Sequence, residues 1–92
     1  MIPLDELEKR IRKTDRDIKR FCKDSDFEIV GVDRVVSEEA AAKVLAYASA
    51  DALRKAIKDR TIDLPYRMLG NGRKYRTIDL ASHIERTYNG GG

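Results

Sequence analysis

A β-hairpin is predicted by Leu64-Pro-Tyr-Arg-Met-Leu-Gly-Asn-Gly-Arg-Lys-Tyr-Arg-Thr77, the most informative part of this chain. Its Asn71-Gly72 dipeptide readily adopts positive φ at both central positions of a type I′ turn. A two-residue turn at this place sets two arginines, Arg67 and Arg76, directly opposite each other. The full register pairs Gly70 with Arg73, Leu69 with Lys74, Met68 with Tyr75, Arg67 with Arg76, and Tyr66 with Thr77.

Alternation along the two strands divides this hairpin into an apolar face and a cationic face. The apolar face holds Tyr66, Met68 and Tyr75, and the cationic face holds Arg67, Lys74 and Arg76. We expect the apolar face to join the core. Opposed arginines cost stability, and no acidic residue lies between Tyr66 and Arg76. This concentration of positive charge therefore predicts an anionic partner, the backbone of a nucleic acid.

The composition is that of one small folded domain, with 92 residues of which 41% are hydrophobic and 38% charged. The net charge is only +3, but it is unevenly distributed. Residues 1–48 carry ten Lys and Arg against eleven Asp and Glu, whereas residues 49–92 carry nine against five. The second half is therefore the candidate binding end.

Several classes of function are not indicated. Met1 precedes an acidic amphipathic segment rather than a secretory leader, and no apolar run is long enough to span a bilayer, so we expect a cytoplasmic protein. Cys22 and His83 stand alone in different predicted elements, which gives no basis for a disulfide or a zinc site. No catalytic constellation is visible, and we expect neither enzymatic activity nor a cofactor.

An amphipathic helix is predicted from about Leu4 to Lys23, with acids near its start and bases near its end. Its apolar stripe is Leu4, Leu7, Ile11, Ile18 and Phe21, interrupted by Thr14. The stripe fits either a short coiled-coil seam or packing on the rest of the domain. Because Thr14 weakens a seam of three heptads, we favour packing within the domain. Cys22 is then expected to be a small buried side chain.

The remaining elements follow from local signals. Residues 27–36 predict a β-branched strand with a bulge or bend at Gly31. Three further helices are expected: one capped by Ser37 and running to about Ala46 or Tyr47, one capped by Ser49 and running from Ala50 to about Asp59, and one capped by Thr77 and running from Ile78 to about Tyr88. Residues 89–92 are expected to form a flexible tail.

Residues 40–88 resemble the excisionase-type, MerR-like winged-helix DNA-binding family of phages and other mobile elements. The resemblance rests on Ala41-Ala42-Lys43-Val44-Leu45, on Ser49 to Lys58, on Leu64-Pro65-Tyr66-Arg67, on Gly72-Arg73-Lys74-Tyr75-Arg76, and on Asp79-Leu80 with Ile84 and Glu85. One departure is Ala46-Tyr47-Ala48, where the family usually has a glycine-containing turn.

The resemblance implies an α+β fold, a winged helix-turn-helix with a two-stranded wing, here with an additional N-terminal helix. Residues 1–36 would form that helix and an extended segment, 37–88 the winged domain, and 89–92 the tail. It also implies that the helix beginning after Ser49 enters the major groove while the hairpin contacts the neighbouring minor groove or phosphates. The implied DNA-binding residues are Ser49, Arg54, Lys55, Lys58, Arg67, Asn71, Arg73, Lys74 and Arg76.

Within this set, arginine is the expected base reader. Asp51, outside the set, either accepts a hydrogen bond from a cytosine amino group or pairs with Arg54 or Lys55, and we favour the pairing. The resemblance implies an excisionase that directs site-specific recombination with an integrase or with further copies of itself, or a small transcriptional regulator. A different class remains open: a protein–protein interaction module that uses the N-terminal helix, with the basic wing against an acidic protein.

Overall fold

The computed structural model describes residues 3–88. Their elements in chain order are α1 (Leu4–Asp24), β1 (Val35–Ser37), α2 (Glu38–Val44), α3 (Ala50–Lys58), β2 (Arg67–Leu69), β3 (Gly72–Arg76) and α4 (Thr77–Thr87). The strands form one antiparallel sheet in the order β1-β3-β2. The fold is therefore small and α+β, as expected. The predicted tail, 89–92, lies outside the described residues.

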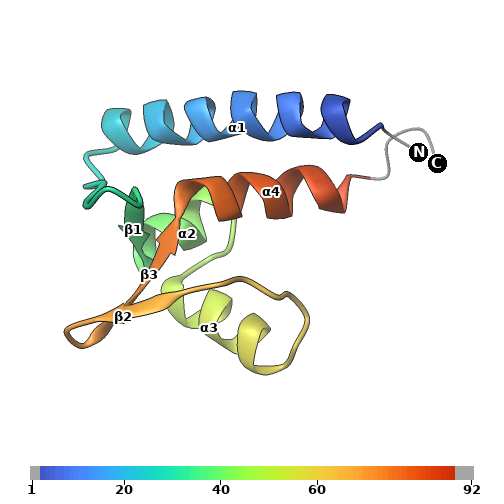
Figure 1. The fold of residues 1–92 in the computed structure, drawn as a ribbon. Coiled ribbons are helices and arrows are strands. Elements are labelled where there is room, and N and C mark those ends of the chain that lie inside the picture. The colour runs from blue at the N-terminus through green and yellow to red at the C-terminus, as the bar shows by residue number, and fades with distance from the viewer. Residues whose placement is uncertain (1–2, 89–92) are drawn as a thin grey trace.

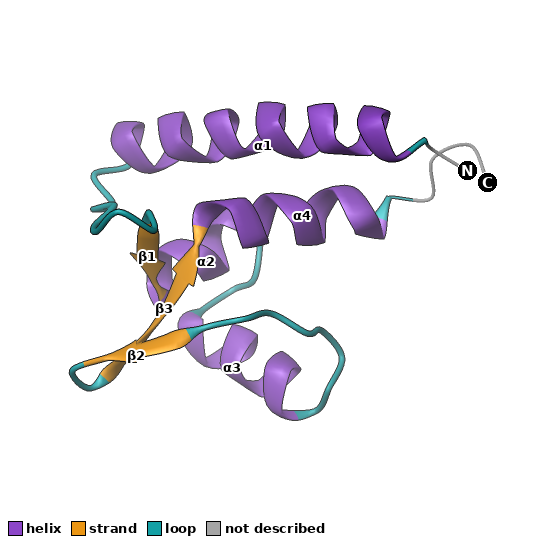
Figure 2. Ribbon diagram, viewed as in Figure 1, coloured by secondary structure: helices purple, strands orange, loops and turns teal. Residues whose placement is uncertain are grey.

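Figure 1 shows α1 and α4 on one side of α2, and α3 with the β2–β3 hairpin on the other. The two longest helices, α1 and α4, lie side by side at one end of the molecule. At the other end lie α3 and the β2–β3 hairpin, and Figure 2 shows the long connection between them passing around the end of α3. This arrangement leaves one side of α3 uncovered by the other elements of the chain.

The helix α1 packs against its own domain. Its inward stripe includes Ile11, Ile18 and Cys22, which are buried, while Phe21 remains 41% exposed. The hydroxyl of Thr14 donates a 2.8 Å hydrogen bond to the Glu85 carboxylate on α4, so the polar position in the stripe has a partner. Burial raises the pKa of the Cys22 thiol. The middle of the apolar stripe is thus packed against α4, whereas Leu4 and Phe21 at its two ends remain exposed.

Tyr75 lies at the centre of the main core, fully buried with Leu53 of α3 and Leu80 of α4. The three successive alanines of α2, residues 40–42, are also buried. Side chains this small let α2 approach both the sheet and α3 closely.

Two of the three predicted helix caps are confirmed. The hydroxyls of Ser37 and Ser49 accept hydrogen bonds from the backbone N–H groups of Ala40 (3.2 Å) and Ala52 (3.1 Å). The prediction for Thr77 is wrong. Thr77 is the buried first residue of α4, and its backbone N–H donates to the carbonyl of Arg34 at 3.0 Å, so that its role is to join α4 to the turn before β1.

Three helices end in the same way, each without glycine. A non-glycine residue with φ near 60° follows α1, α2 and α3, and the N–H of the next residue donates back to a carbonyl in the last turn. The residues are Asp26, Ala46 and Arg60, and the returning bonds are Phe27 to Cys22 (2.8 Å), Tyr47 to Ala42 (2.8 Å) and Thr61 to Ala56 (2.9 Å). Ala46 therefore ends α2 at Val44, earlier than predicted.

The strand predicted over residues 27–36 is wrong for most of its length. Gly31 (φ 78°) and Arg34 (φ 55°) bound a tight turn, across which Val30 and Val35 exchange backbone hydrogen bonds of 3.0 and 2.9 Å. Only Val35–Ser37 belongs to the sheet. Of the predicted bulge or bend at Gly31, the bend is confirmed: the chain reverses here, and glycine permits the positive φ that the turn needs.

The hairpin forms, but with a different turn. Its central residues are Gly70 and Asn71, and Gly70 has a φ of 62°, the feature that a type II′ turn requires at its first position. The observed pairs are Arg67 with Lys74, Met68 with Arg73, and Leu69 with Gly72. The predicted pairing was therefore wrong by two positions. A shift of two preserves alternation, so every residue keeps its predicted face.

Candidate nucleic-acid interface

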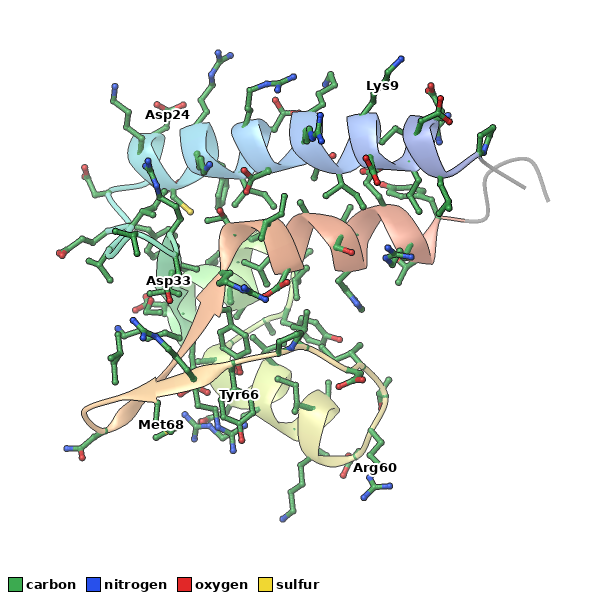
Figure 3. All side chains as sticks on the ribbon, viewed as in Figure 1. Lys9, Asp24, Asp33, Arg60, Tyr66 and Met68 are labelled. Atoms are coloured by element: carbon green, nitrogen blue, oxygen red, sulfur yellow. The ribbon has the colours of Figure 1, made fainter. Side chains whose placement is uncertain are left out.

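The hairpin presents its two faces to different surroundings. Figure 3 shows Tyr66, just before β2, and Met68, within β2, projecting toward the side on which α3 lies, with Asp33 on the other side. We name two surfaces accordingly. The α3-side surface consists of Arg54, Lys55, Lys58, Tyr66, Met68 and Arg73, and the outer sheet face consists of Asp33, Arg67, Lys74, Arg76 and Asp79.

The two arginines of the outer sheet face have acidic partners close by. Arg67 Nε lies 3.2 Å from the Asp33 carboxylate, and Arg76 donates to both oxygens of Asp79 at 2.6 and 3.3 Å. The Asp79 carboxylate raises the pKa of Arg76. The expectation that Arg67 and Arg76 face each other is wrong, because Arg67 faces Lys74. The hairpin itself holds no acid, but the turn before β1 and the start of α4 each contribute a carboxylate.

A hollow of about 190 Å³ lies over this face. Its lining residues are Asp33, Val35, Pro65, Tyr66, Arg67, Lys74, Arg76 and Asp79. Val35 is buried to 1% exposure there, separately from the main core, and Asp33 Oδ1 is buried with no hydrogen-bond partner among residues 3–88. Lys74 has no carboxylate within ion-pair distance in the same range. The outer sheet face is thus a mixed-charge cluster with an excess of one positive charge.

On the α3 side of the hairpin, Arg73 is held by an aromatic ring. Its guanidinium carbon lies 4.6 Å from the ring centroid of Tyr66, within the range of a cation–π contact, and the Tyr66 and Tyr75 centroids are 6.1 Å apart. Burial raises the pKa of Tyr75, whose hydroxyl has no partner of good hydrogen-bond geometry among residues 3–88. Arg73 is therefore restrained by the Tyr66 ring and forms no ion pair with any carboxylate of residues 3–88.

The apolar face of the hairpin is buried only in part. Tyr75 joins the core as predicted, but Tyr66 and Met68 remain 46% and 56% exposed. Met68 lies opposite Arg73, so a cation and an apolar side chain stand next to each other on this face. This combination suits contact with a nucleic acid, which offers charged phosphates beside apolar sugar and base surfaces.

Within α3, Arg54 is bound by two carboxylates. Its Nε and Nη2 donate to the two oxygens of Glu38, both at 3.1 Å, and its Nη1 donates to Asp51 at 3.3 Å. These carboxylates raise the pKa of Arg54. The pair with Asp51 was predicted from their spacing. Glu38 was missed, because it belongs to α2 and comes close only when the two helices pack.

The neighbouring lysines are unpaired. Lys55 and Lys58 are exposed, and no carboxylate of residues 3–88 lies within ion-pair distance of either. They line a shallow hollow with Asp51, Arg54 and Asp59. Ser49 is occupied as a helix cap, and Asn71 lies exposed in the hairpin turn. The structure thus divides the predicted set: α3 and Arg73 share one side, while Arg67, Lys74 and Arg76 lie on the other.

Residues 3–88 hold neither a metal-binding cluster nor a helix suited to spanning a membrane. This range contains no group of three or more His, Cys, Asp or Glu side chains arranged to hold a metal ion. None of its helices combines the length and apolar character needed to cross a membrane. No protein-family model matches the chain, and no curated protein or solved structure matches it.

Proposed function

We propose that this protein binds specific sites in duplex DNA, with α3 as the recognition helix in the major groove and the β2–β3 hairpin as a wing beside it. The observation that carries the proposal is the set of cations on the α3-side surface. Lys55, Lys58 and Arg73 come from two elements, lie on one side of the molecule and form no ion pair within residues 3–88.

The dimensions of α3 support this role. Nine residues give a helix about 13 Å long, and its outward side carries Arg54, Lys55 and Lys58 while Leu53 points into the core. The major groove of B-DNA accepts one such helix with its side chains against the base edges. The buried Leu53 side chain and the Ser49 cap fix α3 in the domain, so that the exposed cations of α3 can contact DNA.

The wing contributes chiefly through Arg73 and its apolar neighbours. Arg73 is held over Tyr66, so less conformational freedom is lost when it meets a phosphate or the minor groove. Arg67 and Arg76 contribute less in this arrangement, because Asp33 and Asp79 already neutralise them. Lys74, also on the outer sheet face, has no carboxylate within ion-pair distance among residues 3–88, so its charge remains available for a phosphate. This proposal keeps all the DNA-binding residues expected from the sequence. The residues of α3 and Arg73 are now expected to contribute more to binding than the others.

The biological role that we propose is that of an excisionase-type factor, with transcriptional regulation as the alternative. Directing recombination requires bent DNA and recruitment of an integrase or of further copies, whereas repression requires only occupancy of a site. The protein–protein module that uses α1 has less support, because Ile11, Ile18 and Cys22 of its apolar stripe are buried within the domain.

An electrophoretic shift assay tests the proposal. Labelled duplexes selected from a randomised pool should be retained by the protein, and unlabelled selected duplex should compete much better than random duplex of equal length. Placing the selected site at different positions along a fragment then separates the two roles, because a bend makes mobility depend on position. Equal competition by all duplexes would reject sequence-specific binding.

A further inference from the structure

The Glu38–Arg54 pair joins the helix before the recognition helix to the recognition helix itself. Glu38 lies in the first turn of α2, and its side chain is only 14% exposed. Its two oxygens accept from Nε and Nη2 of Arg54, so the guanidinium is held along one complete edge. A bidentate contact of this kind fixes the orientation of the guanidinium as well as its position.

Two donors remain on Arg54, the number that a second bidentate contact requires. A guanidinium has five N–H donors, of which Glu38 takes two and Asp51 takes one. One donor is therefore left on each terminal nitrogen. Half of the Arg54 side chain is exposed on the outward side of α3. A pair of donors on adjacent nitrogens matches the O6 and N7 acceptors of guanine in the major groove.

The pair also changes the electrostatic role of Arg54. Its charge is balanced by the Glu38 carboxylate, whereas Lys55 and Lys58 keep theirs. A neutralised arginine gains little from approaching a phosphate, since it releases few counterions, but it can still donate hydrogen bonds to a base. The lysines are then suited to phosphate contact, and Arg54 is suited to reading sequence.

We infer that Glu38 is a specificity-determining positioning residue: it orients Arg54 to read a guanine and withholds the charge of Arg54 from the DNA backbone. This inference rests on the proposed DNA binding and adds to it a residue outside the recognition helix. Glu38 itself need not touch DNA. Its removal should therefore weaken specificity while strengthening non-specific attraction, two effects of opposite sign that a general loss of structure cannot produce.

The test compares Glu38→Gln with Glu39→Gln. The two substitutions change the net charge equally, but Glu39 is exposed and in no ion pair among residues 3–88. Each protein, with the wild type, selects binding sites from a randomised duplex pool. Its affinity for the wild-type site and for random duplex is then measured at several salt concentrations, and thermal melting reports whether the fold is retained.

The expected result is specific to Glu38→Gln. Its selected site loses one guanine that the wild type and Glu39→Gln keep, and its preference for the wild-type site over random duplex falls by roughly 5- to 150-fold, the range for one bidentate base contact. Its plot of log K against log salt for random duplex becomes steeper by about 0.9, as one more cation reaches a phosphate. Arg54→Lys, which keeps the charge without the fork, loses the same guanine.

Two outcomes overturn the inference while leaving DNA binding intact. One is the same selected site and the same salt dependence for Glu38→Gln and Glu39→Gln. The other is an equal loss of affinity on all duplexes with the guanine retained, which gives the ion pair a purely structural role. If the wild type itself selects no duplex from the pool, the proposed function fails, and the inference fails with it.

Discussion

Asp33 and Arg67 form an ion pair, with 3.2 Å between carboxylate Oδ2 and guanidinium Nε, that joins the turn before β1 to the edge strand β2. Arg76 is paired in the same way with Asp79. Most of the positive charge on the outer sheet face is therefore balanced within the domain, whereas Arg73 on the α3 side lies over the neutral ring of Tyr66. Under the proposed DNA binding, this contrast assigns DNA to the α3 side of the hairpin.

Replacement of Arg73 should affect DNA binding more than replacement of Arg76. Arg73→Ala removes an unpaired cation, so affinity should fall on all duplexes, and the slope of log K against log salt should become less negative by about 0.9. Arg76→Ala removes a cation that Asp79 already balances, so less than half of that change is expected. Fluorescence anisotropy at several salt concentrations measures both. A larger change in slope for Arg76→Ala would assign DNA to the outer sheet face.

The two glycines of the hairpin should differ in their tolerance of a side chain. Gly70 has a φ of 62°, so Gly70→Ala should destabilise the protein by about 1–2 kcal/mol. Gly72 is not among the residues with positive φ, and a Cβ there would meet nothing within 4 Å, so Gly72→Ala should change stability by less than about 0.5 kcal/mol. Urea denaturation compares them. A larger cost at Gly72 would instead support a turn centred on Asn71 and Gly72.

A glycine at Ala46 should stabilise the protein. Ala46 has a φ of 65°, a conformation that costs an alanine about 1–2 kcal/mol, and relief of that cost exceeds the added entropy of a glycine in the unfolded chain. Ala46→Gly should therefore raise the free energy of unfolding by about 0.5–1 kcal/mol, or the melting temperature by a few degrees. Ala48→Gly is the control, because Ala48 lies in the same turn, is exposed and is not among the positive-φ residues. Equal effects at both positions would contradict the strain at Ala46.

The phenol of Tyr75 should make the fold sensitive to alkaline pH. Burial, the largest influence, raises its pKa in the folded state above the ordinary tyrosine value of 10.0. The unfolded chain then releases this proton first, so the stabilisation is complete below about pH 10 and is lost as the pH rises through the folded-state pKa.

Tyr75→Phe should reduce this alkaline loss of stability relative to the wild type, with Cys22 common to both proteins. At neutral pH it should change stability by no more than about 1 kcal/mol, because the hydroxyl has no partner of good hydrogen-bond geometry within residues 3–88. An unchanged alkaline decline in Tyr75→Phe would assign the effect to other groups.

The sequence correctly predicted the features that depend on residues close together in the chain. The α1 helix has its acids and bases placed along the helix dipole, and Ser37 and Ser49 cap their helices through their own hydroxyls. The hairpin was also predicted with the correct faces, because alternation survives a shift of the register by two residues.

The predictions were wrong where contacts between residues far apart in the sequence determine the local structure. Gly70-Asn71-Gly72 allows two turns, and pairing of β3 with both β1 and β2 selects one of them. Thr77 is drawn into the fold by a hydrogen bond to Arg34, and no local pattern reveals that contact. Asp33 and Glu38 reach their arginine partners only after packing, so the sequence predicted the cations of the candidate site without the carboxylates that distinguish them.

The salt dependence of DNA binding tests the central claim most directly. For a duplex selected by the wild type, the slope of log K against log salt should be about −2.7 or steeper, as expected if Lys55, Lys58 and Arg73 each neutralise one phosphate. In the Lys55→Ala/Lys58→Ala double variant the slope should become less negative by about 1.8, with melting unchanged because both side chains are exposed. An affinity that does not change between low and moderate salt, or a double variant with the wild-type slope, would contradict binding of DNA by the α3-side surface.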